Sequence, residues 1–324
     1  MARPGGQSAV KADNPDRTAR LPVDMAIRPL TNQEFTLFQT LIHRKAGIYL
    51  SPAKKTLLEG RLNKRLRELG LNSFGDYYRL VIEERDGAEL VHLLDRISTN
   101  ETHFFREPRQ FSFVEQRVFP EWTSQAASGM RSRRIRVWSA GCSTGEEPYS
   151  IAMTLWERFP PSAGWEIEIL ATDLSTRALD VARTAVWPIT KAKEIPPGYL
   201  KRFMLKGTRT QEGKMKAGPE IRSIVRFERL NLNDEAYPVT GLFDLIFCRN
   251  VLIYFDAQSR VRVIHRLLNH LAPSGYLFVG HAESLNAVTD RVQPVMPTVY
   301  IYAGEKQWEV KTSAAPLPGG EVVR

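Results

Sequence analysis

Apolar residues recur at three- and four-residue intervals in the first hundred residues, which is the spacing of amphipathic helices. Thr31 followed by Glu34 has the form of a capping box at the start of the first helix. Ser51 and Pro52 are a suitable N-cap and first residue for a second helix, and Gly47 separates the two. We expect an N-terminal helical domain at residues 25–97, with helices over about 31–46, 51–69, 74–84 and 88–97.

From residue 98 to residue 304, short apolar strands alternate with helical stretches, as in a doubly wound α/β fold. We expect this Rossmann-like domain to carry a small β-subdomain insertion at about 187–222, where prolines, glycines and basic residues interrupt the alternation. Residues 1–24 and 305–324 lack periodicity and are expected to be disordered tails. Later strands are expected at 165–173, 224–232, 243–248 and 276–280, an antiparallel finish at 292–302, and helices at 175–185 and 257–271.

The stretch 134–159 passes from a strand, through a turn with Gly141 and Gly145, into a helix. This order opens a Rossmann-like unit, which binds its cofactor beyond the carboxyl end of the strand. Two acids, Glu146 and Glu147, follow the glycines, and the spacing is not G-x-G-x-x-G. Carboxylates at a helix start would repel a pyrophosphate, whereas S-adenosylmethionine carries a sulfonium and an ammonium group and no phosphate. The turn therefore favours S-adenosylmethionine over a dinucleotide.

Asp173 closes the expected second strand, where an acid can accept hydrogen bonds from ribose hydroxyls. Its other possible role is to cap the helix that follows. Cys142 lies in the glycine turn and Cys248 ends the fourth strand. Their pattern indicates neither a disulfide nor a zinc site. If both strands end at the same edge of the sheet, both thiols lie near the cofactor, and we expect them to be reduced.

The composition, with 43% hydrophobic and 25% charged residues, is that of an ordinary globular protein. No apolar run approaches the roughly 20 residues that span a bilayer, and no signal-peptide core is present, so we expect a cytoplasmic protein without membrane insertion. A net charge of +9 suits nucleic acid, an anionic membrane or an acidic protein. Lys54, Arg61 and Arg65 lie on one side of the second helix, as either a solvated face or a docking surface for an acidic partner.

Five segments, in order along the chain, closely resemble the CheR-type chemotaxis receptor methyltransferases. They are ISTNETHFFRE, VWSAGCSTGEEPYSIAM, ATDLS, FDLIFCRNVLIYFD and GYLFVGHAESL. The resemblance extends from Thr31 to Ala303 and implies a helical domain joined to an S-adenosylmethionine-dependent methyltransferase domain with a small β-subdomain. It also implies transfer of the methyl group to glutamate side chains of methyl-accepting chemotaxis receptors, with glutamyl methyl esters and S-adenosylhomocysteine as products.

The same resemblance implies roles for single residues. Arg106, near the reacting centre, and Tyr254, facing the methyl group, are the expected catalytic residues. One of Glu146 and Glu147 would contact the methionyl or ammonium end, and we favour Glu147. Asp173 would hold the ribose. Asn231 and Leu232 would flank the adenine, and Cys248 and Arg249 would border the pocket at the fourth strand. The other expected cofactor contacts are Asn100, Thr102, Arg106 and Gly141.

The implied chemistry suits these residues. A glutamate with a pKa of about 4.3 is ionised at neutral pH, so the nucleophile needs no general base. Arg106 would orient the acceptor carboxylate by a charge-assisted hydrogen bond while Tyr254 shapes the approach to the methyl group. Receptor helices are acidic around the target glutamates, which makes Lys54, Arg61 and Arg65 candidate docking residues. We expect a monomer that needs no metal.

Two alternatives stay open. A nucleic-acid methyltransferase would share the fold and the basic charge, but the fourth strand ends in RNVLIYF rather than a Pro-Pro-aromatic segment, and no stacking platform for bases is visible. We therefore expect no nucleic-acid partner. A non-catalytic module that binds the cofactor and a receptor is the second alternative, and the presence of Arg106 and Tyr254 argues against it.

Overall fold

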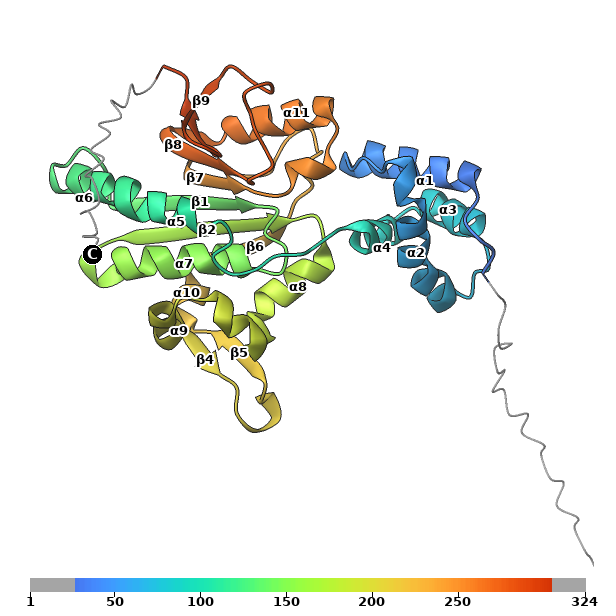
Figure 1. Ribbon diagram of the computed structural model, residues 1–324, viewed down its shortest axis with the longest axis horizontal. Helices are drawn as coiled ribbons and strands as arrows, with labels where there is room; N and C mark the ends of the chain where they lie inside the picture. The colour runs from blue at the N-terminus through green and yellow to red at the C-terminus, as the bar shows by residue number, and fades with distance from the viewer. Residues whose placement is uncertain (1–26, 305–324) are drawn as a thin grey trace, which may run out of the picture.

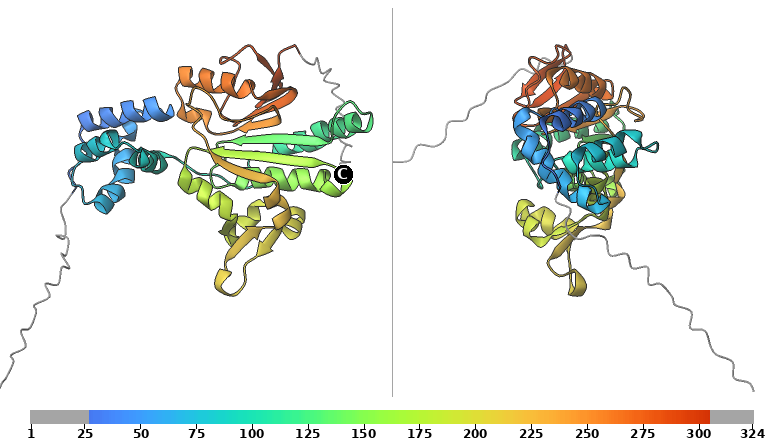
Figure 2. Two further views of the ribbon diagram at one scale, coloured as in Figure 1. Left: turned by 180° about the vertical axis from the view of Figure 1, so that it is seen from behind. Right: turned by 90° about the vertical axis from the view of Figure 1, so that its right-hand side faces the viewer.

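The computed structural model describes residues 27–304, and the tails predicted at 1–24 and 305–324 lie outside these residues. Figure 1 shows a helical domain, in blue, beside one end of a central sheet, and a small yellow subdomain on one side of that sheet. The left view of Figure 2 agrees with Figure 1 in placing the helical domain beside the carboxyl ends of the parallel strands. Within residues 27–304, no helix is long and apolar enough to cross a bilayer.

The helical domain contains four helices, whose apolar faces form one core. They are α1 (Asn32–Ala46), α2 (Lys55–Leu69), α3 (Phe74–Glu83) and α4 (Ala88–Ile97). The Thr31 hydroxyl accepts the Glu34 N–H and the Glu34 carboxylate accepts the Thr31 N–H, which confirms the predicted capping box. The start of the second helix differs from the prediction, because Pro52–Lys54 forms a 3₁₀ turn (η1) and the Ser51 side chain makes no capping bond.

The α/β domain is built on a seven-stranded sheet. Its strands are β1 (Arg134–Ala140), β2 (Glu166–Asp173), β6 (Val225–Arg229), β7 (Phe243–Cys248), β8 (Leu271–Val279), β9 (Val292–Met296) and β10 (Val299–Tyr302). The order is β6-β2-β1-β7-β8-β10-β9. The first five strands are parallel, and β10 and β9 form the predicted antiparallel finish. Strand order reverses between β1 and β7, which is the switch point of a doubly wound sheet.

Helices cover both faces of this sheet (Figure 1). One face carries α5 (Pro108–Phe113), α6 (Phe119–Ala127), α7 (Glu146–Arg158) and α8 (Thr176–Thr184), and the other carries α11 (Ala257–Leu268). The apolar run FDLIFC of β7 is mostly buried between these layers, as expected for a central parallel strand. The helical stretch at 108–127, in which the π-helical turn η2 (Val114–Val118) joins α5 to α6, is not among the predicted elements.

Other element boundaries also differ from the prediction. Helix α11 ends at Leu268 and β8 begins at Leu271, so the predicted proline–glycine turn lies inside a strand. The pairing of β7 with β8 shifts register at this end, which accommodates the proline. Strand β6 stops at Arg229, before the predicted end at Leu232. The predicted cap of α11 is confirmed, because the Asp256 carboxylate accepts the N–H three residues further on at 2.7 Å.

The predicted β-subdomain is a three-stranded antiparallel sheet that lies on the α7 and α8 side of the main sheet (Figure 1). In spatial order its strands are β3 (Val186–Pro188), β5 (Lys214–Ala217) and β4 (Met204–Lys206). It also contains the 3₁₀ segment η4 (Ile189–Glu194) and the helices α9 (Pro197–Phe203) and α10 (Pro219–Ser223). The short strands are as predicted, and the helices are additional. Prolines that interrupt the sequence pattern stand at the first positions of α9 and α10, where they are tolerated.

Candidate functional site

A cavity of about 290 Å³ lies at the carboxyl ends of β1, β2 and β7, where the helical domain meets the sheet. A doubly wound sheet binds its ligands at this place, and the volume suits a small molecule. The lining includes Ala46 and Ile48 from the helical domain and the connecting segment 97–102. Ten predicted site residues also line it: Asn100, Thr102, Arg106, Gly141, Glu147, Asp173, Asn231, Leu232, Arg249 and Tyr254.

The turn after β1 requires glycine at position 141. Gly141 has a φ of +92°, and a Cβ atom there would lie 2.4 Å from Val251 Cγ2. The N–H groups of Gly141 and Cys142 both donate to the Thr172 carbonyl, at 2.7 and 2.9 Å, which ties the turn to the end of β2. The absence of a side chain at Gly141 therefore makes room for Val251, and both residues line the cavity.

Asp173 stands at the end of β2 and braces the glycine turn. Its two carboxylate oxygens accept the N–H groups of Ser143 and Ser175, both at 2.8 Å. Burial raises the pKa of Asp173 above its ordinary value, against the lowering effect of these two hydrogen bonds. The cap of α8 is Ser175, whose hydroxyl accepts the Ala178 N–H, so the helix-capping role considered for Asp173 belongs to its neighbour.

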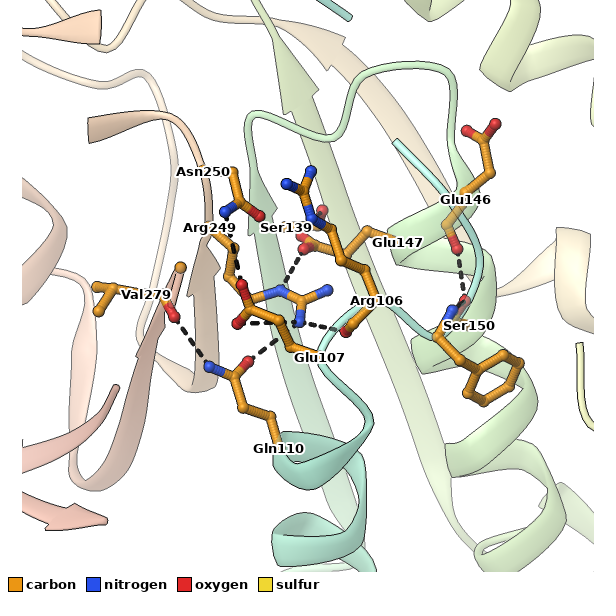
Figure 3. A network of polar contacts seen from close by, with 12 residues as sticks. Arg106, Glu107, Gln110, Ser139, Glu146, Glu147, Ser150, Arg249, Asn250 and Val279 are labelled. Atoms are coloured by element: carbon orange, nitrogen blue, oxygen red, sulfur yellow. Dashed lines mark hydrogen bonds and ion pairs between the residues drawn. The ribbon is translucent and has the colours of Figure 1, made fainter. Parts of the chain in front are cut away.

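The two adjacent acids point in different directions (Figure 3). Glu147 lines the cavity and accepts hydrogen bonds from Ser139 Oγ and Arg249 Nε, both at 2.7 Å. Glu146 is outside the lining, with its side chain 1% exposed and 2.8 Å from Lys191 Nζ. The preference for Glu147 therefore agrees with the geometry. A cofactor contact by the Glu146 side chain is a prediction that the structure does not support.

The Arg249 side chain is 1% exposed. It binds several groups at the base of the cavity (Figure 3). Besides Glu147, it donates to the Arg106 carbonyl at 2.6 Å and to Gln110 Oε1 at 3.1 Å. Glu107 Oε2 lies 3.8 Å from the same guanidinium. Sequence reasoning missed Glu107 and Gln110, although both lie in the polar segment that follows Arg106. This network fixes the backbone from which the Arg106 side chain projects.

Arg106 lies between two residues with left-handed backbone. Phe105 has a φ of 51° and Glu107 a φ of 59°, which are uncommon for residues other than glycine. The Phe105 N–H donates to Ser150 Oγ at 2.9 Å, and the Arg106 carbonyl faces Arg249. The Arg106 guanidinium points away from the Arg249 cluster (Figure 3). Strained backbone of this kind persists where the surroundings fix it, and such places are often functional sites.

The end of β7 presents Arg249 and Asn250 to the cavity rather than Cys248. Cys248 is fully buried among the apolar residues that pack against α11, because side chains alternate between the faces of a strand. Cys142 is also buried outside the lining. The prediction that both thiols border the cofactor is therefore corrected. Burial raises the pKa of both thiols well above the ordinary value, which keeps them protonated and unreactive.

Tyr254 lies in a 3₁₀ turn, η6 (Leu252–Tyr254), that is fixed from two sides. Its carbonyl accepts the Tyr49 N–H at 2.8 Å, which links the turn to the helical domain. Glu283, which is buried and which sequence reasoning missed, accepts the N–H groups of Asn250 and Ile253. The turn that carries Tyr254 is therefore rigidly placed at the cavity.

Asn231 and Leu232 follow β6 and line the cavity beside the helical domain. The Asn231 amide donates to the Lys45 carbonyl at 2.7 Å, at the carboxyl end of α1. Asn231 therefore holds the helical domain in place as well as lining the cavity. The sequence pattern alone could not reveal this contact, because it joins residues that are 186 positions apart.

Two of the three predicted docking residues, Arg61 and Arg65, lie in α2 and contact other residues of the chain, whereas Lys54 lies in η1. Arg65 forms an ion pair with the buried Glu89, with Nε and Nη2 donating at 2.9 and 2.5 Å. Arg61 donates to the Ile97 carbonyl and to the Thr99 hydroxyl. Both guanidinium groups therefore have partners inside the chain. The docking role of Lys54, Arg61 and Arg65 stays a prediction.

The strand order is that of a doubly wound sheet. Gly141, with its left-handed backbone after β1, and Asp173, at the end of β2, line one cavity at the edge of this sheet. This combination defines a Rossmann-like domain built to hold a nucleoside-containing cofactor. The acids at the start of α7 disfavour a cofactor with phosphates at this turn, which agrees with S-adenosylmethionine.

Comparison with known proteins extends this assignment. Residues 33–98 match the family described as CheR methyltransferase, all-alpha domain, and residues 100–301 match the CheR methyltransferase, SAM binding domain. The chemotaxis protein methyltransferase of Borreliella burgdorferi is 36% identical, over 84% of this chain and 94% of that protein. The protein of that name in Escherichia coli is 37% identical (84% and 91% covered), and that of Salmonella typhimurium 34% (94% and 98%). The chain belongs to the CheR methyltransferase family, and its cofactor is S-adenosylmethionine.

Proposed function

We propose that this protein transfers the methyl group of S-adenosylmethionine to glutamate side chains on the cytoplasmic helices of chemotaxis receptors. The observation that carries the proposal is the single cavity, which brings Asn100, Arg106, Gly141, Asp173 and Tyr254 together at the edge of the sheet. The names of the relatives, chemotaxis protein methyltransferases, support the receptor as the acceptor. Because the acceptor helices are cytoplasmic, we place the reaction in the cytoplasm.

The cavity residues fit the cofactor by charge and by shape. Asp173 would accept hydrogen bonds from the ribose hydroxyls, and Glu147 would face the ammonium end. Gly141 lines the same cavity as these two acids, and the cofactor would lie against its backbone. Asn100 and Thr102 would contact it from the connecting segment, and Asn231 and Leu232 would border the adenine beside the helical domain.

The residues at the reacting centre position the acceptor rather than remove a proton. When bound, S-adenosylmethionine supplies an electrophilic methyl group on a sulfonium. An acceptor glutamate is already ionised at neutral pH, so no general base is required. Arg106 would hold the acceptor carboxylate by a charge-assisted hydrogen bond, and Tyr254 would limit the direction from which it approaches. Arg249 contributes by fixing the Arg106 backbone.

The test is a methylation assay with labelled S-adenosylmethionine and a panel of receptor cytoplasmic fragments. We expect base-labile label on the receptor, recovered as methanol, because a glutamyl methyl ester hydrolyses in base. Fragments in which alanine replaces the acceptor glutamates serve as the control and should stay unlabelled. Label that resists base, or that transfers to nucleic acid instead, would contradict the proposal.

A further inference from the structure

The β-subdomain packs directly against the segment that carries Arg106. The Trp187 indole N–H donates to the Thr144 carbonyl at 3.1 Å, and the Phe104 ring meets the Trp187 ring edge-on with centroids 5.0 Å apart. The Phe105 ring stacks on Tyr199 at 5.3 Å with an interplanar angle of 7°. The insertion therefore forms part of the wall behind the candidate catalytic segment.

Two polar residues of η4 bind the backbone of the same segment. Lys191 Nζ donates to the Thr102 carbonyl at 2.9 Å, and Glu194 Oε2 accepts the Phe104 N–H at 3.0 Å. Lys191 also forms the ion pair with Glu146, whose side chain is buried outside the cavity lining. The 3₁₀ segment η4 thus binds two backbone groups of the segment that carries Arg106: the Thr102 carbonyl and the Phe104 N–H.

These contacts matter because residues 98–107 have no regular secondary structure of their own. Thr102 lines the cavity, and Arg106 follows four residues later, between two residues with left-handed backbone. Such a conformation has to be held by contacts from outside the segment. Arg249 and Ser150 hold its end, and Lys191 and Glu194 hold its middle.

We propose that Lys191 is a positioning residue for methyl transfer. Lys191 Nζ binds both the Thr102 carbonyl and the buried Glu146 carboxylate. It thereby sets the path of the backbone that places the Arg106 guanidinium at the acceptor. This inference rests on the proposed function and assigns the inserted subdomain a part in the reaction. Small displacements of a positioning group lower the rate of the chemical step more than they lower substrate affinity.

The test compares K191M, K191R and K193M in the receptor methylation assay. Lys193 lies on the same 3₁₀ segment and is exposed, so K193M is the matched control. We expect kcat of K191M to fall about tenfold or more while KM for the receptor fragment changes by less than about twofold. K191R should recover most of the lost rate, and K193M should match the wild-type protein. Wild-type kcat in K191M would overturn the inference.

A second variant separates positioning from folding. K191M leaves Glu146 buried without its cation, whereas E146Q/K191M removes both charges. We expect the double variant to regain the wild-type unfolding midpoint and to keep the low kcat, because the bond to the Thr102 carbonyl is still missing. If kcat recovers together with stability, Lys191 only neutralises Glu146, and the inference is wrong.

Hydrogen–deuterium exchange tests the same claim without turnover. The amides of residues 100–107 should exchange faster in K191M and in E146Q/K191M than in K193M or the wild-type protein. Unchanged exchange would overturn the inference whatever the substrate is. A wild-type protein that binds S-adenosylhomocysteine but labels no receptor would instead refute the proposed function, so the two failures are distinguishable.

Discussion

Replacing Arg249 by methionine tests the buried ion pair at the base of the cavity. The Arg249 side chain is 1% exposed and donates to Glu147, to the Arg106 carbonyl and to Gln110. Methionine keeps a long apolar side chain in this place and removes all of these bonds. Glu147 then keeps the Ser139 hydroxyl as a donor but loses its cation.

The expected loss of stability follows from these contacts. Removing one partner of a buried ion pair costs about 3–5 kcal/mol, because the other charge stays buried. In R249M/E147Q that charge is also gone. The main remaining loss is two hydrogen bonds, to the Arg106 carbonyl and to Gln110, at about 1 kcal/mol each, and the longer contact with the more exposed Glu107 adds little. We therefore expect the single variant to lose about 3–5 kcal/mol of unfolding free energy and the double variant about 2 kcal/mol.

Urea unfolding followed by circular dichroism measures both values. R109M is the matched control, because Arg109 is an exposed arginine on the neighbouring helix α5. We expect the control to stay within about 0.5 kcal/mol of the wild-type protein. A single variant as stable as wild type, or a double variant no more stable than the single one, would refute the reasoning.

Three further predictions concern the cavity. Gly141→Ala should weaken S-adenosylhomocysteine binding in calorimetry by about tenfold or more, because its Cβ would meet Val251 at 2.4 Å and its φ of +92° disfavours alanine; unchanged affinity would argue against close contact at the turn. Arg106→Ala should keep its circular dichroism spectrum and lose about 100-fold in kcat, with R109A unaffected; an unchanged rate would remove Arg106 from the mechanism. Burial raises the pKa of Asp173, so cofactor affinity should fall as the pH falls through that raised pKa and the carboxylate is protonated. The stability of the free protein should instead fall as the pH rises through the same pKa, because the buried carboxyl group then becomes charged. A D173N variant with the wild-type pH profiles would refute this.

The sequence predicts those parts of the site that depend on local spacing. Gly141, the acids after it and Asp173 follow strand ends, and parallel strands bring their carboxyl ends to one edge, so their meeting at a single cavity was predictable. Because side chains alternate between the two faces of a strand, Cys248 and Arg249 point to opposite sides of the sheet. The sequence does not say which of the two faces the ligand, since both sides of the sheet are buried.

Other features depend on contacts between distant parts of the chain. Arg249 binds Gln110 across 139 positions, and Lys191 binds Thr102 across 89. No local pattern marks either pair. The helical spacing correctly places Arg65 on the basic face of α2, but it does not reveal that Glu89 of α4 is the partner of Arg65. Helical spacing predicts which charged side chains lie on the surface of a helix, but only the fold shows whether another charged residue pairs with them.

A crystal structure with bound S-adenosylhomocysteine would test most directly whether one cavity holds the methyl donor. We expect the ligand between Gly141 and Tyr254, with its ribose hydroxyls within hydrogen-bond distance of the Asp173 carboxylate and its amino group beside Glu147. A ligand bound elsewhere, or a ribose that does not contact Asp173, would contradict this arrangement.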